Sequence, residues 1–248
     1  MLLQHCHDTI TPYYLFLVYL YKGDPVNQSN TTLFYIHDPM CAWCWGFRPV
    51  WQQLKAQLEE SLEIVYVVGG LAPDSNQPMP LVMQKNLAAT WHRIQQQIPD
   101  TKFNHQFWHP ASNTHPRRST YPACRAVLAA KLQDSQAEDS MILGIQRAYY
   151  IEAKNPSNID LLADVARDIG LNAEQFRQDV ASQALEVEFQ EQLKLARQLS
   201  TQGFPSLVLQ QAGKLHAIPL DYNHSHSMHQ SIVNLTLAAQ AHSHNYGT

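Results

Sequence analysis

The most informative hydrophobic pattern of the chain lies between residues 33 and 69. The short apolar run Leu33–His37 predicts a strand, and a break follows at Pro39. Apolar residues then recur at steps of three and four, which predicts one face of a helix from about Cys41 to Leu62. The residues on this face are Cys44, Phe47, Trp51, Leu54 and Leu58. Glu63–Gly69 is rich in β-branched residues and predicts a second, buried strand, which completes a βαβ unit with parallel strands.

From Ala72 to about Ser200 the strand signals vanish and helical patterns repeat. The predicted helices are Leu81–Ile98, Tyr121–Leu132, Ala137–Ala153, Ile159–Ile169, one that starts at Asn172, and Ala184–Leu199. Asn158 is a predicted N-cap, and Asn172 with Gln175 has the spacing of a capping box. The region therefore predicts a helical insertion between two halves of a sheet domain.

Strand patterns return near the C-terminus. Ser206–Gln210 and Leu215–Pro219 predict a hairpin with the four-residue connection Gln211–Lys214. A final helix is expected at Ser225–Ala241, with Ile232, Leu235 and Ala239 as its inward face and a frayed tail after it. The fold class is therefore α/β. The expected organisation is an extension or linker at 1–31, a sheet domain at 32–73 and 201–242, a helical domain at 74–200, and a tail at 243–248.

Composition narrows the possible functions. The 248 residues are 45% hydrophobic and 15% charged, with a formal net charge of −4, which argues against nucleic acid as a partner. Nine apolar residues at Tyr13–Tyr21 are too few to span a bilayer, and they lack the flanks of a signal peptide. This segment could form an extra edge strand or an N-terminal arm, or it could be an extension that results from a start codon assigned too far upstream. We expect a cytoplasmic protein without a membrane partner.

Cys41 and Cys44 stand at the predicted start of a helix, after a strand. Unpaired backbone N–H groups and the helix dipole stabilise a thiolate there and lower its pKa from about 8.5. A second cysteine three residues on lies about one turn away and can close a disulfide, so the pair has the form of a redox dithiol. A zinc site would need four ligands, and only the distant Cys6 and Cys124 remain, so no metal is expected. Simple burial of both cysteines is the other alternative.

The chain resembles the DsbA-like branch of the thioredoxin superfamily over about residues 32–242. The segments that carry the resemblance are Asp38–Phe47 (DPMCAWCWGF), Tyr121–Val127 (YPACRAV) and Gly203–Ser206 (GFPS). The resemblance implies a thioredoxin-like fold, with a central mixed β-sheet and a large all-helical insertion domain. It also implies the chemistry of a disulfide oxidase, reductase or isomerase.

The resemblance assigns roles to particular residues. It implies that Cys41 is the attacking thiolate, that Cys44 is the resolving thiol, and that Pro205 follows a cis peptide bond beside the disulfide. Such a bond would turn backbone groups of Phe204 toward a bound peptide; on its own, Pro205 could equally be an edge-strand or turn proline. Tryptophans are candidates for the apolar rim of a substrate groove. They are Trp43, Trp45 and Trp51, of which Trp51 fits the helix core better.

Two features depart from the family pattern. The buried acid that the family has six residues before the first cysteine is replaced by Tyr35. Proton transfer to and from Cys44 would then rely on water, His37 or Asp38, although either side chain could instead be a turn or capping residue. Ala42 and Trp43 also replace the Pro-His dipeptide of DsbA between the cysteines, so the redox direction stays open.

Weaker signals have two interpretations each. Cys124 is a third redox thiol or an inert helix cysteine, and Arg117 and Arg118 bind a substrate carboxylate or glutathione, or else belong to a solvated loop. The histidines near the last helix bind a metal opportunistically or lie on the surface. They are His224, His226 and His229.

The leading hypothesis is a thiol–disulfide oxidoreductase that acts on protein or peptide thiols and disulfides. No bound cofactor is expected, and glutathione or a thioredoxin-type protein is a candidate recycling partner. One alternative is a glutathione-dependent transferase or isomerase of the kappa-class or hydroxychromene-carboxylate isomerase type. Those families usually carry a serine at the position of Cys41. Another alternative is a non-catalytic thioredoxin-like binding module or chaperone.

Overall fold

The computed structural model describes residues 31–58, 61–109, 116–199 and 203–244, with side chains up to Ala238. The Tyr13–Tyr21 segment, Cys6, the Ala239 side chain and the end of the tail lie outside this description, so the predictions for the segment, for Ala239 and for the end of the tail stay predictions.

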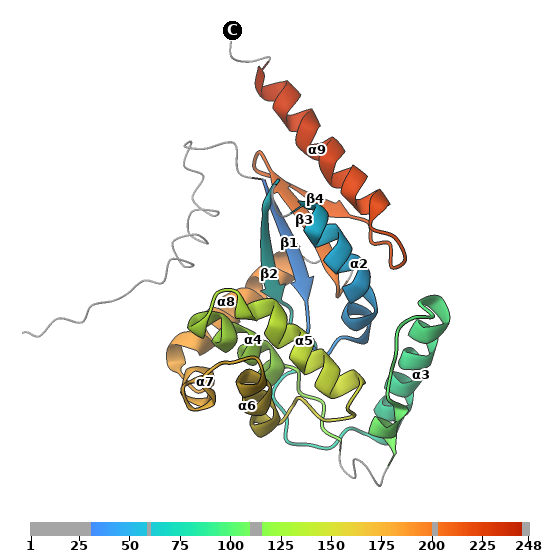
Figure 1. Cartoon of the computed structure of the whole chain (residues 1–248), viewed down its shortest axis with the longest axis vertical. Helices are drawn as coiled ribbons and strands as arrows, with labels where there is room; N and C mark the ends of the chain where they lie inside the picture. Colours follow the sequence, from blue (N-terminus) through green and yellow to red (C-terminus); the bar gives the residue numbers. More distant parts are fainter. Residues whose placement is uncertain (1–30, 59–60, 110–115, 200–202, 245–248) are drawn as a thin grey trace, which may run out of the picture.

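A four-stranded mixed sheet stands at the centre of the molecule (Figure 1). Its strands are β1 (Thr32–His37), β2 (Glu63–Val68), β3 (Ser206–Gln211) and β4 (Lys214–Ile218), in the spatial order β2-β1-β3-β4. β1 pairs in parallel with β2 and antiparallel with β3, and β3 pairs antiparallel with β4. The predicted βαβ unit, hairpin and mixed sheet are therefore confirmed.

The two faces of the sheet are covered by different helices, because successive strand residues point to opposite sides. Phe34 and Val65 belong to a cluster that includes residues of α8 (Gln183–Leu199). Tyr35 and its neighbour Tyr66 belong to the larger cluster, which includes core residues of α2 (Ala42–Leu58) and of α9 (His226–His244). The larger cluster continues into the helical insertion without a break. The sheet and the insertion therefore share one hydrophobic core.

The helices of the insertion follow β2 and precede β3 in the chain. They are α3 (Leu81–Gln97), the 3₁₀ helix η1 (His105–Trp108), α4 (Tyr121–Gln133), α5 (Ala137–Tyr150), α6 (Ile159–Asp168), α7 (Ala173–Val180) and α8. In Figure 1, α4 to α7 gather below the sheet, and α3 stands apart on the side of α2. The element order confirms the predicted block of helices between two parts of a sheet.

Two helices are shorter than expected. Leu62 lies outside α2, since the N–H groups of Ser61 and Leu62 both donate to the carbonyl of Leu58 in a turn. The helix α5 ends at Tyr150, and Ala153 beyond it has a φ of 56°, a left-handed conformation that does not continue a helix.

The hairpin connection is two residues long, so the prediction of four residues is wrong. Gln211 and Lys214 already pair across the hairpin, which leaves Ala212 and Gly213 as the turn. Both have positive φ values, 48° and 72°, as a type I′ turn requires. The sequence does not indicate this turn, because alanine rarely adopts a conformation with positive φ.

The predicted N-caps are confirmed, but the capping box is not. The Asn158 side chain accepts from the N–H of Asp160, and Asn172 accepts from the N–H groups of two residues of α7. Gln175 does not return the contact, because it donates to Asp179 instead. The N–H of Asn172 donates to Gln133 of α4, at 3.0 Å. A tertiary contact therefore replaces the local one.

Candidate active site

Cys41 and Cys44 lie at the junction of β1 and α2, both as free thiols. The N–H of Cys41 donates to the carbonyl of Asp38 at 3.0 Å, and the carbonyl of Cys41 accepts from the N–H of Trp45 in the first helical turn. Cys41 keeps 6% of its surface exposed, whereas Cys44 is fully buried. A reagent or substrate therefore reaches Cys41 first.

The surroundings shift the pKa values of the two thiols in opposite directions. The hydrogen bond from the Cys44 thiol lowers the pKa of Cys41, with help from the backbone N–H groups of Cys44 and Trp43, while burial opposes the change. Burial raises the pKa of Cys44 well above its ordinary value, and the bond to Cys41 adds to this. Cys41 is thus the more acidic thiol and keeps a little exposed surface, and Cys44 is the less acidic thiol behind it.

The loop before β3 brings Phe204 and Pro205 to the pair. The Phe204–Pro205 peptide bond is cis, and Pro205 is buried. The sulfur of Cys41 donates to the carbonyl oxygen of Phe204 at 3.4 Å. A Cβ atom on Gly69, directly after β2, would lie 2.2 Å from two ring atoms of Phe204. Gly69 is therefore the residue whose missing side chain lets the Phe204 ring lie against the backbone.

The tryptophans have different surroundings. Trp43 is half-buried and meets Tyr222 edge-on, with ring centroids 5.2 Å apart. Trp45 stacks on Tyr150 and donates to the carbonyl of Lys102 at 2.9 Å. Trp51 is fully buried and donates to Tyr66, which confirms that it belongs to the core. Trp43 and Trp45 thus flank the pair on the α9 side and on the insertion side.

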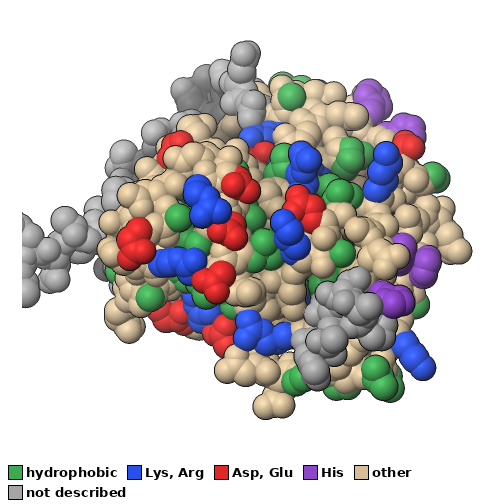
Figure 2. Space-filling view, turned by 60° about the horizontal axis from the view of Figure 1, so that its bottom comes forward, with side chains coloured by type: hydrophobic (Ala, Val, Ile, Leu, Met, Phe, Trp, Pro, Cys, Tyr) green, Lys and Arg blue, Asp and Glu red, His purple; other side chains and the backbone are tan. Residues whose placement is uncertain are grey.

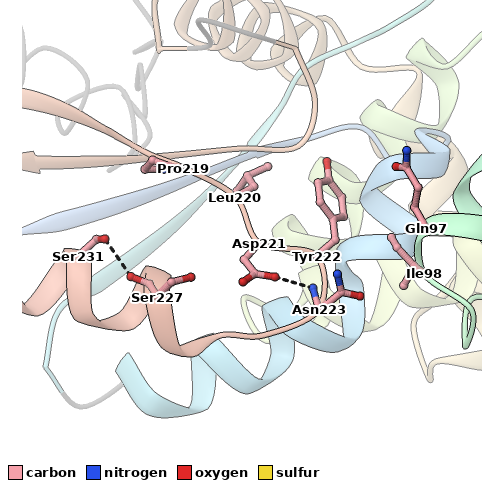
Figure 3. A pocket seen from close by; sticks show the side chains of 9 residues that line it. All are labelled: Gln97, Ile98, Pro219, Leu220, Asp221, Tyr222, Asn223, Ser227 and Ser231. Atoms are coloured by element: carbon pink, nitrogen blue, oxygen red, sulfur yellow. Dashed lines mark hydrogen bonds between the residues drawn. The ribbon is translucent and has the colours of Figure 1, made fainter.

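A pocket of about 650 Å³ lies beside Tyr222. Figure 3 shows Leu220 and Tyr222 on the loop between β4 and α9, with Gln97 and Ile98 at the end of α3 opposite. The pocket is lined by Gln97, Ile98, Pro219, Leu220, Asp221, Tyr222, Asn223, Ser227 and Ser231. Sequence reasoning missed Tyr222, because a single loop tyrosine gives no pattern that links it to Cys41.

Asp38 is a fully buried carboxyl next to the pair. It accepts from the N–H of Met40 at 2.8 Å and from the N–H of Leu71 at 2.7 Å. The thiol of Cys124 donates to it at 3.8 Å. Burial raises the pKa of Asp38, and hydrogen bonds from Thr120, Leu71 and Met40 oppose the rise. A buried acid is therefore present, at a position other than that of Tyr35.

His37 lies in an aromatic cluster instead. Its ring stacks on Tyr35 at 5.2 Å and meets Tyr66 edge-on at 5.8 Å. Neither ring nitrogen has a hydrogen-bond partner among the described residues. Burial lowers the pKa of His37 to about 3, so the imidazole is neutral near pH 7.

The structure also shows the surroundings of the residues with weaker sequence signals. Cys124 is buried, and burial raises the pKa of its thiol, which contradicts an acidic, reactive thiol at that helix start. Arg117 bonds to Asn76 and to the carbonyl of Ser157, within the insertion. Arg118 bonds to Tyr149 and contributes positive charge near Asp38. Within the described ranges, no group of three or more His, Cys, Asp and Glu side chains could hold a metal ion.

Positive and negative side chains are mixed on the face shown in Figure 2, over the helical part of the molecule. Among the described residues, Arg125 forms ion pairs with Asp74 and Glu186. None of the helices in the described part of the chain is both long and apolar enough to cross a membrane.

Solved structures with the same architecture include a candidate protein disulfide isomerase from Nitrosomonas europaea. It has a TM-score of 0.73 and 24% identity, and the match covers 84% of this chain and 98% of that one. The cytosolic disulfide reductase DsbM from Pseudomonas aeruginosa has a TM-score of 0.68 and 24% identity, with 84% and 100% covered. At this identity the likeness shows the fold alone, which is that of DsbA-like thiol–disulfide oxidoreductases.

Curated relatives carry a different description. The ClpXP adapter protein SpxH of Bacillus subtilis (strain 168) is 24% identical over 170 residues, which are 68% of this chain and 55% of that protein. SpxH of Halalkalibacterium halodurans is 25% identical over 153 residues, 58% of this chain and 47% of that protein. The chain spans about half the length of these relatives.

A family model described as Thioredoxin matches residues 34–226, which include most of β1, both cysteines, the helical insertion and Pro205. The match covers more than half of the chain, and the mixed sheet and the helix that follows Cys41 agree with it. The chain therefore belongs to this thioredoxin family.

Proposed function

We propose that the protein is a thiol–disulfide oxidoreductase that acts on protein or peptide disulfides through Cys41 and Cys44. The observation that carries the proposal is the position of the Cys41 sulfur, 3.4 Å from the Phe204 carbonyl, with a lowered pKa and a little exposed surface. Nucleophilic attack requires a thiolate that a substrate can reach.

The exchange proceeds in two balanced steps. The Cys41 thiolate attacks one sulfur of a substrate disulfide, so a mixed disulfide forms and the other substrate sulfur leaves as a thiolate that takes a proton. Cys44 then loses its proton and attacks the Cys41 sulfur, which breaks the mixed disulfide and releases the second substrate thiol. Two electrons pass to the substrate, and Cys41–Cys44 becomes a disulfide. The reverse sequence oxidises a dithiol.

Asp38 is the better candidate for accepting the proton of Cys44. Its carboxyl is buried with a raised pKa, and its charge and backbone both act on Cys44. His37 is held neutral in the aromatic cluster and stays neutral down to a pH of about 3, so it is a weak proton acceptor. We therefore assign the proposed proton relay to Asp38, and a packing role to His37.

We place the substrate-binding surface at Trp43, Trp45 and the backbone of Phe204, which contacts the Cys41 sulfur. A peptide lying along Phe204 would add main-chain hydrogen bonds, as in strand addition. The pocket beside Tyr222 continues this surface on the Trp43 side. The residues around the pair thus suit an extended peptide.

Glutathione is the proposed recycling thiol, and the cytoplasm is the proposed location. DsbM, which shares the fold, is named a cytosolic disulfide reductase and has been solved with GSH. Reduction of substrate disulfides at the expense of glutathione is therefore the direction that we propose.

Insulin reduction in the presence of glutathione tests the proposal. We expect turnover by the wild type and a loss of about two orders of magnitude in Cys41→Ser, because a hydroxyl of ordinary pKa is a weak nucleophile. Circular dichroism would show that the variant is folded. Equal turnover by wild type and Cys41→Ser would overturn the assignment.

A protein-binding role without catalysis is the second candidate, and the description of the curated relatives as ClpXP adapters favours it. In that case binding of an unfolded protein would survive the loss of both thiols. We would compare how the wild type and Cys41→Ser/Cys44→Ser suppress aggregation of a reduced, unfolded protein. Equal suppression, combined with no insulin turnover by the wild type, would favour this second role.

A further inference from the structure

The carboxyl of Asp38 connects the redox pair with the helical insertion. One oxygen accepts from Met40, just before Cys41. The other accepts from the N–H of Leu71, after β2, and from the Cys124 thiol, in the first turn of α4. Asp38 and Cys124 are both fully buried. A residue more than 80 positions away in the chain therefore contacts the acid beside the pair.

The start of α4 is fixed in place around this contact. The N–H of Cys124 donates to the carbonyl of Thr120 at 3.0 Å. The hydroxyl of Thr120 accepts from the N–H of Ala72 at 3.0 Å, and the Thr120 side chain also bonds to Asp38. Burial and the charge of Asp38 raise the pKa of the Cys124 thiol. Cys124 thus keeps its proton and is suited to donate to a carboxylate rather than to attack a disulfide.

Asp38 in turn acts on both cysteines. The hydrogen bond from Cys44 lowers the pKa of Cys41, whereas the negative charge of Asp38 opposes that change. The same charge adds to the burial that raises the pKa of Cys44. The titratable and charged groups that face Asp38 are Cys41, Cys44, Arg118, Cys124, Tyr149 and Tyr150.

We propose that Cys124 is a positioning residue of the redox site, whose thiol holds the Asp38 carboxyl in place and thereby sets how readily Cys41 becomes a thiolate. The inference rests on the proposed redox function of Cys41 and Cys44. Cys124 itself exchanges no electrons. Loss of its thiol removes one hydrogen-bond donor from the buried carboxylate, which favours the protonated form of Asp38. Less negative charge then stands beside Cys41, so its thiolate and the reduced pair are stabilised.

The test uses Cys124→Ala and Cys124→Val in the full chain. The first variant leaves a small cavity and the second fills the space, but both remove the donor. We would follow alkylation of Cys41 by iodoacetamide against pH, by mass spectrometry of its peptide, and the redox equilibrium with glutathione. Both variants should be alkylated at lower pH than the wild type. Their equilibrium should shift about two- to fivefold toward the reduced pair, as the loss of one modest hydrogen bond would produce.

Two further variants separate the loss of the hydrogen bond to Asp38 from a loss of packing. Val127→Ala removes buried apolar atoms from the same helix but no hydrogen-bond donor, so it should lower the melting temperature and leave the alkylation profile unchanged. In an Asp38→Asn background, Cys124→Ala should have no further effect on the profile, because the two residues act through one contact.

Wild-type profiles in both Cys124 variants, or a shift that persists in the Asp38→Asn background, would overturn the inference. Failure of the proposed function itself looks different, because insulin turnover would then not depend on Cys41. If turnover requires Cys41 and the Cys124 variants match the wild type, only the role of Cys124 is wrong.

Discussion

The sulfur of Cys41 lies 3.4 Å from the carbonyl oxygen of Phe204, although 163 positions separate the two residues in the chain. The contact exists because β3 pairs with β1, so the loop that enters β3 reaches the end of β1 where α2 begins. It places the candidate nucleophile beside backbone that an extended peptide could pair with.

The two thiols should titrate apart. Because the hydrogen bond from Cys44 lowers the pKa of Cys41, while burial raises that of Cys44, we expect iodoacetamide to modify Cys41 at a pH below that of an ordinary thiol. Cys44 should stay unmodified until the chain unfolds. Peptide mass spectrometry after short exposures from pH 5 to 9 measures both sites. Equal labelling of the two cysteines in the folded protein would contradict the division of roles.

Gly69→Ala should disturb the site through Phe204. The new methyl would lie 2.2 Å from the Phe204 ring, so the ring and its carbonyl must move. We expect a destabilisation of about 1–3 kcal/mol, typical of overpacking, and slower insulin reduction. The double variant Gly69→Ala/Phe204→Ala removes the clash and should recover most of the stability in denaturant titrations. If the double variant is no more stable than Gly69→Ala, the clash is not the cause.

His37→Phe should make the protein less sensitive to acid. The pKa of His37 is about 3 in the folded chain and about 6.5 in the unfolded chain, so between these values only the unfolded state binds the proton. His37 therefore reduces the free energy of unfolding as the pH falls through this window, by at most about 1.4 kcal/mol per pH unit.

Phenylalanine keeps the stacking on Tyr35 and removes two ring nitrogens that have no partner among the described residues. At pH 7 the variant should be as stable as the wild type or more stable. Its advantage should grow to about 2 kcal/mol by pH 5. Urea titrations at the two pH values measure the difference, and parallel losses in both proteins would exclude His37 as the source.

Asp139→Asn should weaken the attachment of the insertion to the sheet domain. The Asp139 carboxylate on α5 accepts from Arg48 and Gln52 on α2 and from Tyr66 on β2. The side chains of Arg48 and Asp139 are only 11% and 27% exposed, so loss of the charge should cost about 1–3 kcal/mol.

The matched control for Asp139→Asn is Asp164→Asn, which removes the charge from an exposed ion pair with Arg167. The side chains of Asp164 and Arg167 are 53% and 63% exposed. The control substitution should change the free energy of unfolding by no more than about 0.5 kcal/mol. Denaturant titration compares the two variants. Similar losses at both sites would show that burial does not distinguish these ion pairs.

Local patterns in the sequence determined most of the secondary structure and the chemistry of one segment. The spacing of Cys44, Phe47 and Trp51 predicted the helix, and the position of Cys41 at its start predicted a thiol with a lowered pKa. Asn158 and Asn172 marked helix starts correctly, because capping depends on neighbours within a few residues. The Ala212–Gly213 turn was missed, since pairing of the two strands forces alanine into a conformation that its own preference disfavours.

Only the tertiary structure decided which distant groups surround the sulfurs. Phe204 approaches Cys41 through the pairing of β3 with β1, and Cys124 approaches Asp38 through the packing of the insertion against the end of the sheet. The structure also distinguished Asp38 from His37, adjacent residues that the sequence left equivalent, because their side chains enter different surroundings. Burial, hydrogen bonding and pKa depend on neighbours in space. The sequence by itself therefore determined the elements and the thiol pair, and the packing of those elements decided the protonation of each group.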